Sequence, residues 1–270
     1  MSTPPSKLDN FSLCASHQPG KNVAPKKQVT AMSSLLEYRL LSFDVYGTLI
    51  DWESGILNAF QTYLAQHNAS DKFSRKHLLE IFQGFEREQQ AKTPDMLYSQ
   101  LLTAIHPLWA QELGLPLPSA GESAEFGRSV GQWPAFPDSV NALKRLSKTY
   151  KLLILSNVDR ESLGQTLAGP LNGVHFDTVL TAQDLKSYKP DLRNFECMLD
   201  VVKSEYGFEK TQVLQTAQSQ FHDHYPARRI GIKSVWIERS GAIMGNQAEE
   251  IYDWKFDKLV DMADAVEKEL

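Results

Sequence analysis

Four polar segments of this chain each follow a short apolar run and carry side chains that catalysis commonly uses. A carboxylate at a strand end can act as a nucleophile, a lysine can neutralise it, and small polar side chains can donate hydrogen bonds to an anion. The set therefore raises the hypothesis of a nucleophilic aspartate with polar support. The segments are "FDVYGTL" with Asp44, "LSN" with Ser156 and Asn157, "YKPD" with Lys189, and "TAQSQFHDH" with Gln218, Ser219, Gln220, His222 and Asp223.

The first segment lies within "YRLLSFDVYGTLIDWE", residues 38–53. Gly47 permits a sharp turn after Asp44, and the Thr48 hydroxyl can satisfy either a loop backbone group or the carboxylate itself. The residue two positions beyond the acid is Tyr46. Taken alone, an aspartate after an apolar strand is more often a turn or capping residue than a nucleophile.

The other three segments also have purely structural explanations. Ser156 and Asn157 could cap a helix, Lys189 could be a solvated surface lysine, and Asp223 could be an acid in the first turn of a helix. Each explanation accounts for one segment. None explains why all four segments fall at consecutive strand ends, so we favour a common site.

Strands that alternate with helices must position these side chains. Because strands separated by helices of this length pair through right-handed crossovers, the pattern predicts an α/β fold with a parallel sheet covered on both faces. Ligands of such sheets bind beyond the carboxyl ends of the strands. The apolar runs typical of buried strands occupy residues 39–47, 150–157, 176–182, 212–217 and 233–238.

A long segment without a convincing strand interrupts this alternation. Residues 54–135 contain three long helical patterns, which predicts a helical cap over the strand ends, with "WPAFPDS" (133–139) as the return hinge. A helical layer within one continuous domain is the alternative. Residues 37–53 and 136–270 would then form the Rossmann-like catalytic core. Residues 1–36, rich in Ser, Pro, Lys and Gln, predict a disordered tail rather than an arginine-rich mitochondrial presequence.

Composition restricts the possible partners. The chain has 270 residues, 42% hydrophobic content and a formal charge of -5, which favours a small-molecule partner over nucleic acid. Cys14 and Cys197 lie far apart and indicate neither a disulfide framework nor a zinc site. No apolar run approaches the length of a membrane span or a secretory signal. We expect a cytoplasmic protein that does not bind membranes.

In this order, "FDVYGTL", "LSN", "YKPD" and the final "HD" resemble the four signature motifs of the haloacid dehalogenase-like superfamily. The resemblance covers residues 38–260 and implies a Rossmann-like α/β core with an inserted all-helical cap. In phosphatases of this superfamily, the residue two beyond the nucleophile is a second aspartate that protonates the leaving alcohol, and acids of the fourth motif help to hold magnesium.

This chain departs from the phosphatase pattern at two places. Tyr46 replaces the second aspartate, and a phenol is a poor proton donor at neutral pH. Gln218 and Ser219 stand where a magnesium-binding acid would fall, and Asp44 and Asp223 alone supply little charge for a hard dication. We therefore expect no cofactor, with Mg²⁺ needed only if the phosphatase alternative holds.

"DVYGTL", "FPDSVNALKRL", "LLILSN" and "YKPD" are instead similar to the L-2-haloacid dehalogenase branch. That resemblance implies that Asp44 displaces a halide from a saturated carbon of a small acidic substrate and forms an ester, which water then hydrolyses. A departing halide needs no proton. It implies further roles for other residues: Lys189 would orient Asp44, Asp223 would fix Lys189 and help to place the water, and Tyr46 would close the pocket. Ser156 and Asn157 would bind the substrate, with Thr48 and Gln220 as further contacts.

The cap helix departs from this branch too. Bacterial members carry an arginine there that cradles halide and carboxylate, whereas this chain has Gln83 at the corresponding place and Arg87 about one turn further on. His222 could be the general base for the hydrolytic water, or a histidine bonded to backbone. The segment around it resembles a fungal-type subgroup of the branch, and the branch implies a possible homodimer. Two alternatives remain open: a catalytically silent relative that binds an acidic metabolite, and a hydrolase for a larger natural product.

Overall fold

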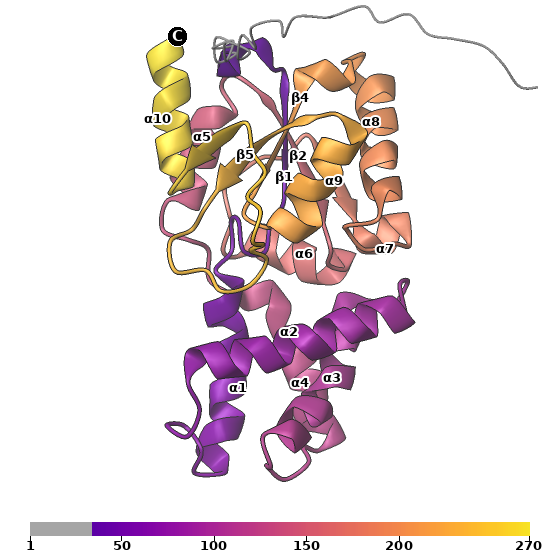
Figure 1. The fold of residues 1–270 in the computed structure, drawn as a ribbon, viewed down its shortest axis with the longest axis vertical. Helices are drawn as coiled ribbons and strands as arrows, with labels where there is room; N and C mark the ends of the chain where they lie inside the picture. Colours follow the sequence, from indigo (N-terminus) through magenta and orange to yellow (C-terminus); the bar gives the residue numbers. More distant parts are fainter. Residues whose placement is uncertain (1–33) are drawn as a thin grey trace, which may run out of the picture. The chain divides into compact units, whose positions relative to one another are not determined.

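The computed structural model of this protein describes residues 34–270 and centres on a six-stranded parallel sheet in the order β3-β2-β1-β4-β5-β6 (Figure 1). The predicted parallel α/β fold is confirmed, and each of the five predicted strands is present. The sequence reasoning missed the edge strand β6. The strands are β1 (Leu40–Phe43), β2 (Lys151–Ser156), β3 (Thr178–Thr181), β4 (Val213–Ala217), β5 (Lys233–Ile237) and β6 (Trp254–Phe256).

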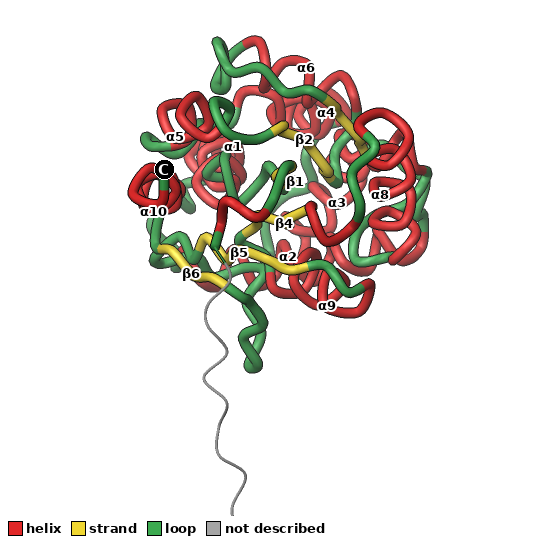
Figure 2. The backbone as a smooth tube through the Cα atoms, turned by 90° about the horizontal axis from the view of Figure 1, so that it is seen from above, coloured by secondary structure: helices red, strands yellow, loops and turns green. Residues whose placement is uncertain are grey.

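Helices cover both faces of the sheet (Figure 2). Successive strand residues point to opposite faces, so the central strands β1, β2 and β4 each contribute to two hydrophobic clusters. Leu41, Leu152 and Leu214 belong to the cluster with α5 and α10, whereas their neighbours belong to the cluster with α8 and α9. The core helices are α5 (Ser139–Leu146), α6 (Arg160–Ala168), α7 (Ala182–Leu185), α8 (Leu192–Tyr206), α9 (Tyr225–Ile230) and α10 (Leu259–Glu269).

Between β1 and β2 the chain forms a helical region beyond the carboxyl ends of the strands (Figure 1). The chain leaves and returns side by side, because Asp51 donates its N–H to Pro134 O at 2.8 Å and Phe136 donates to Leu49 O at 3.0 Å. This crossing coincides with the predicted hinge. The helices are α1 (Trp52–Gln66), α2 (Arg75–Lys92), α3 (Tyr98–Glu112), α4 (Ala120–Arg128) and the short 3₁₀ helix η2 (Ser129–Gln132).

A buried glutamate ties this cap to the core. Glu53 on α1 is 3% exposed, and its Oε1 accepts the N–H groups of Ile243 and Met244, each at 2.7 Å. Its Oε2 lies 3.0 Å from Arg75 at the start of α2. One carboxylate thus joins two cap helices to the loop after β5.

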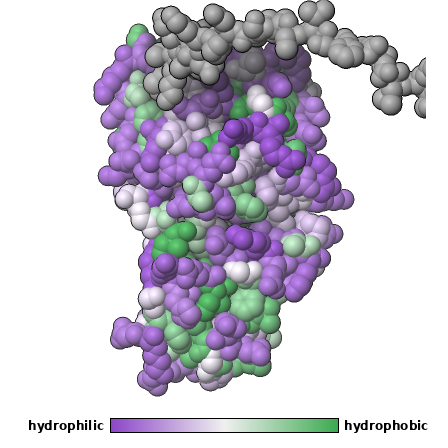
Figure 3. Space-filling view, in the orientation of Figure 1, coloured by the Kyte–Doolittle hydropathy of each residue, from purple (hydrophilic) through white to green (hydrophobic). Residues whose placement is uncertain are grey.

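The last three residues of the predicted tail, 34–36, are described, and Leu35 and Leu36 pack with the core. The tail predicted for residues 1–36 lies outside the described residues up to residue 33. Leu35–Glu37 form a 3₁₀ helix, and Leu35 is buried. The boundary at 36 was therefore wrong, because Leu35 packs into the core. Among residues 34–270, no helix has the length and apolarity to cross a membrane, and the face in Figure 3 is largely hydrophilic.

Candidate active site

The turn after β1 presents the Asp44 carboxylate at the carboxyl edge of the sheet. Gly47 adopts a φ of +99°, which L side chains rarely adopt, so the glycine is what allows the chain to reverse here. The Thr48 hydroxyl donates to Asp44 Oδ2 at 2.6 Å and accepts the N–H of Gln218 at 2.8 Å. Thr48 therefore orients the carboxylate and links it to the loop after β4.

Lys189 lies between two carboxylates. Its Nζ is 2.9 Å from Asp44 Oδ1, 2.8 Å from Asp223 Oδ1 and 2.8 Å from the Leu155 carbonyl oxygen. Lys189 is only 2% exposed. Gln215 adds a second hydrogen bond to Asp223 Oδ1 at 2.9 Å. The ammonium group uses all three of its donors on protein oxygens and fixes the position of the Asp44 carboxylate.

The charges of this cluster depend on burial. Burial by itself would lower the pKa of Lys189, but the carboxylates of Asp223 and Asp44 outweigh it and hold that pKa above its usual value. Burial raises the pKa of Asp223, against the lowering effect of Lys189. Two carboxylates share one ammonium, so the more deeply buried acid gains a proton more readily than a free aspartate would.

The two polar side chains after β2 have different environments. Ser156 lines the same cavity as Asp44, and its buried hydroxyl makes no hydrogen bond within the described residues. The Asn157 amide is occupied, because it accepts the Lys189 N–H at 2.7 Å and donates to the Lys189 carbonyl at 3.0 Å. Ser156 is thus available to a ligand, whereas the Asn157 side chain holds the loop that carries Lys189.

The segment after β4 begins with a π-helical turn, Gln220–His224, that leads into α9. His222 lines the cavity, and its Nδ1 lies 3.0 Å from the Ser219 hydroxyl. Burial, followed by the charge of Lys189, lowers the pKa of His222 to about 4, so its imidazole is neutral at neutral pH. Asp223 Oδ2 has no hydrogen-bond partner within residues 34–270. A neutral base and a free carboxylate oxygen therefore line one cavity.

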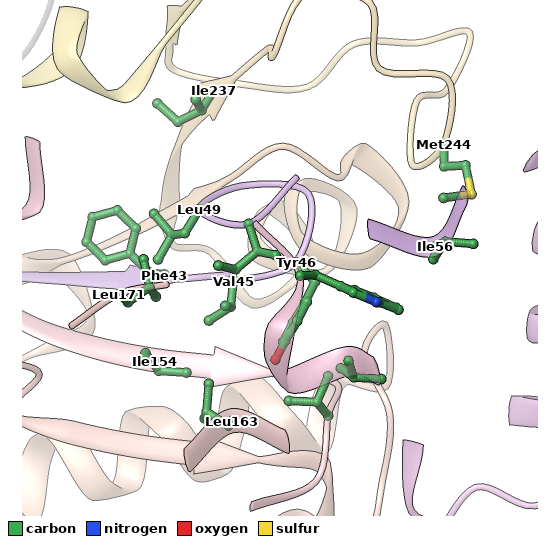
Figure 4. Packing of buried hydrophobic residues seen from close by; sticks show 14 of the residues in the cluster. Phe43, Val45, Tyr46, Leu49, Ile56, Ile154, Leu163, Leu171, Ile237 and Met244 are labelled. Carbon is green, nitrogen blue, oxygen red and sulfur yellow. The ribbon is translucent and has the colours of Figure 1, made fainter. Parts of the chain in front are cut away.

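Tyr46 forms a wall of this cavity. Its side chain extends toward α6 (Figure 4), where its hydroxyl lies 2.7 Å from the Thr166 hydroxyl. Its ring meets Trp133 edge to face, with centroids 5.8 Å apart. Burial raises the pKa of Tyr46 well above its usual value, so the phenol stays protonated. Tyr46, which stands at the position of the phosphatase proton donor, thus directs its hydroxyl to Thr166 and not to the Asp44 carboxylate.

Two residues expected to contact substrate do not line the cavity. Arg87 is exposed, and its guanidinium lies over the Phe221 ring, 5.3 Å from the centroid. Gln220 is fully buried and accepts the Ile251 N–H at 2.8 Å. The structure brings the other eight predicted residues together, namely Asp44, Tyr46, Thr48, Ser156, Asn157, Lys189, His222 and Asp223.

The cap contributes cavity residues that the sequence reasoning missed. Glu86 and Gln90 of α2, Tyr98 of α3 and Trp52 of α1 line it from the cap side, and the cavity volume is about 40 Å³. A signal was present for Glu86, because the buried positions Leu78, Leu79 and Phe82 of α2 continue to it at helical spacing. A cavity of this size suits a ligand of few heavy atoms.

The donor set fits a hard divalent cation poorly. Within residues 34–270, no group of three or more His, Cys, Asp or Glu side chains is arranged to hold a metal. Asp44 and Asp223 are bridged by the Lys189 ammonium, which occupies the region between the acids. Mg²⁺ takes carboxylates and waters in octahedral geometry, and a cation would meet the charge of Lys189 there. We therefore derive no step through a metal.

The fold and site define an α/β protein with a buried aspartate under a helical cap. Comparison with known proteins extends this: residues 38–214 match the sequence model described as haloacid dehalogenase-like hydrolase. The chain belongs to this family and is a haloacid dehalogenase-like hydrolase, as the four sequence motifs predicted.

Individual relatives agree with this assignment. The chain is 27% identical to (S)-2-haloacid dehalogenase of Pseudomonas sp. (strain YL), over 81% of this chain and 90% of the relative. It is 28% identical to (S)-2-haloacid dehalogenase 4A of Burkholderia cepacia, over 75% and 84% of the two chains.

Solved structures share the fold. L-2-haloacid dehalogenase from Xanthobacter autotrophicus aligns with a TM-score of 0.70 at 19% identity, covering 85% of this chain and 98% of the other. A Bacillus subtilis HAD-hydrolase bound to magnesium aligns with a TM-score of 0.68 at 18% identity, covering 85% and 98%. The likeness in fold therefore does not by itself say whether this chain uses a metal.

Proposed function

We propose that this protein hydrolyses a bond from a saturated carbon to a leaving group through an ester of Asp44. The observation that carries the proposal is the position of the Asp44 carboxylate, which is held by Lys189 at 2.9 Å and Thr48 at 2.6 Å while its side chain stays 10% exposed at the cavity. Each carboxylate oxygen accepts one hydrogen bond from the described side chains and keeps lone-pair capacity for attack. The nearby Tyr46 phenol offers no acid for an alkoxide leaving group, which favours a halide.

In the second step, water attacks the carbonyl carbon of the ester. His222 is a neutral base at the cavity, and the free Oδ2 of Asp223 can accept a hydrogen bond from the water. The water proton passes to His222 and then to solvent, and Asp44 returns to its carboxylate form. Lys189 stabilises the negative charge that develops on Asp44 during this step.

The similarity to (S)-2-haloacid dehalogenases suggests which substrates to test first. We propose a small carboxylic acid, or the corresponding amide or alcohol, that carries a halogen on its second carbon, with Ser156 as a free hydroxyl donor at the cavity. Membership of the fungal-type subgroup, a cytoplasmic location and a homodimer remain predictions from the sequence.

Oxygen labelling tests the ester route. With enzyme in excess over (S)-2-chloropropionate in H₂¹⁸O, a single turnover should place the label in the Asp44 peptide, because water attacks the Asp44 carbonyl carbon. The Asp223 peptide of the same digest serves as the control and should stay unlabelled. Product formation with an unlabelled Asp44 peptide would contradict the proposal.

A further inference from the structure

A buried acid of the cap faces the candidate nucleophile across the cavity. Glu86 on α2 is 4% exposed and lines the same cavity as Asp44 and Lys189. The Tyr98 hydroxyl donates to Glu86 Oε1 at 2.5 Å, and this is the one hydrogen bond that the Glu86 side chain makes within the described residues. Its second oxygen, Oε2, is free to meet a bound molecule.

Among the described residues, the charged side chains that line the cavity leave no free cation to balance an anion. The charged side chains that line it are three acids, Asp44, Glu86 and Asp223, and one base, Lys189. The Lys189 ammonium already contacts three protein oxygens. Arg87, the neighbour of Glu86, points away and stacks on Phe221. A substrate carboxylate brought into this cavity would be desolvated beside like charges without a cation to balance it.

We propose that Glu86 determines the charge of the substrate, which is an uncharged molecule whose end opposite the reacting carbon donates a hydrogen bond to Glu86. A primary amide or a hydroxyl is the group that fits. Gln90, one helical turn beyond Glu86, lines the cavity with an amide that can pair with the same end. This inference rests on the proposed function and specifies its substrate class: 2-halo amides or halo alcohols in preference to free 2-halo acids.

The reaction itself stays the same for an uncharged substrate. An Asp44 oxygen forms a bond to the carbon as the carbon–halogen bond breaks, and the halide leaves with the electron pair. Water then cleaves the ester, so the products are the hydroxylated amide or the diol, halide and one proton. Asp44 loses its negative charge on attack, and no other reactant is needed.

Substrate preference in matched variants tests the role of Glu86. Glu86→Gln keeps the shape and the acceptor for Tyr98 but removes the negative charge. Glu88→Gln is the control, because Glu88 lies on the same helix with 69% side-chain exposure, 3.6 Å from Lys92. We expect the unchanged protein at about pH 8 to favour (S)-2-chloropropionamide over (S)-2-chloropropionate by at least about tenfold in kcat/KM. Glu86→Gln should lower this ratio about tenfold or more, and Glu88→Gln should leave it unchanged.

Binding of unreactive analogues separates this inference from the proposed reaction. Calorimetric titration with lactamide and lactate needs no turnover, so a failure of the ester route leaves it informative. Tighter binding of lactamide, reduced in Glu86→Gln, supports the inference. Tighter or equal binding of lactate to the unchanged protein, or no binding of either ligand, would overturn it. Thermal unfolding of each variant checks that Glu86→Gln is folded.

Discussion

At the scale of single residues, the site depends on one ammonium group shared by two carboxylates. Lys189 contacts Asp44, Asp223 and a carbonyl oxygen, and its side chain is 2% exposed. Without it, two acids would face each other in a poorly solvated space. Lys189 therefore serves both the stability of the core and the proposed chemistry, and the surface-lysine explanation fails at this position.

Replacement of Lys189 should damage both properties. We expect Lys189→Met to lower the free energy of unfolding by about 3–5 kcal/mol, because it leaves buried charges unpaired. The rate with a 2-halo substrate should fall at least about a hundredfold, since the ester and its hydrolysis lose their electrostatic support. Urea unfolding and initial rates measure the two effects. Lys76→Met, at a side chain with 71% exposure, is the control; equal stability and rate in both variants would refute this role.

At the scale of elements, a hydrogen bond from the Tyr98 hydroxyl to the Glu86 carboxylate joins α3 to α2. Burial raises the pKa of Glu86 to about 7, although Tyr98 and then Arg87 act in the opposite direction. The titratable groups around Glu86 lie on the cap, on the loop before Lys189 and at the cavity floor, and the guanidinium of its chain neighbour Arg87 acts on it while stacking on Phe221. These groups are Tyr98, Tyr188, Asp44, Lys189, His222 and Asp223. Protonation of Glu86 therefore makes this contact between α2 and α3 depend on pH.

The stability of the protein should therefore depend on pH through Glu86. A carboxyl with a raised pKa in the folded state stabilises below its ordinary pKa of 4.5, and this contribution disappears as the pH rises through about 7. Glu86→Gln does not titrate. Between about pH 4 and pH 8, its free energy of unfolding should gain roughly 3 kcal/mol relative to the unchanged protein.

Urea unfolding at both pH values gives this difference. Comparison between variants cancels the titration of other buried groups, among them His222 and Asp223. Glu88→Gln should follow the unchanged protein at every pH. A difference between Glu86→Gln and the unchanged protein that does not vary with pH would show that Glu86 keeps the same protonation state throughout.

At the scale of the whole molecule, the fold alone does not specify the chemistry. The chain aligns with a haloacid dehalogenase and with a magnesium-bound hydrolase at TM-scores of 0.70 and 0.68, so the choice of chemistry depends on the side chains at the strand ends. Here the Tyr46 hydroxyl is hydrogen-bonded to the Thr166 hydroxyl, and the Lys189 ammonium lies between the carboxylates of Asp44 and Asp223. Both features favour chemistry without a metal.

We expect activity on 2-halo substrates to be insensitive to metal removal. Treatment with EDTA followed by gel filtration should leave the rate unchanged, and added Mg²⁺ should not raise it, because the two acids are already neutralised in part by an ammonium group. Hydrolysis of p-nitrophenyl phosphate, measured in parallel, should be absent with and without Mg²⁺. Loss of halide release on chelation, restored by Mg²⁺, would favour the phosphatase alternative.

The sequence by itself determined the parallel fold and most of the candidate site. In a parallel sheet the carboxyl ends of neighbouring strands meet at one edge, so a local pattern of apolar run and polar terminus suffices to bring Asp44, Ser156 and Asp223 together. The loop that carries Lys189 comes after β3 and α7, so the same rule places it at this edge of the sheet. This is why seven of the ten predicted residues line one cavity, and an eighth, Thr48, donates a hydrogen bond to Asp44 beside it.

The tertiary structure alone decided which cap residues face that edge. Adjacent helical positions point about 100° apart, so a rotation of α2 by about that angle would exchange Arg87 for Glu86 at the cavity. Contacts distant in the chain fix that rotation, among them the bond from Tyr98 to Glu86. The same holds for Asn157, whose amide pairs with the backbone of Lys189, 32 residues away. The apolar spacing of α2 indicates which face of the helix turns inward, but which residue of that face reaches the cavity depends on packing between elements.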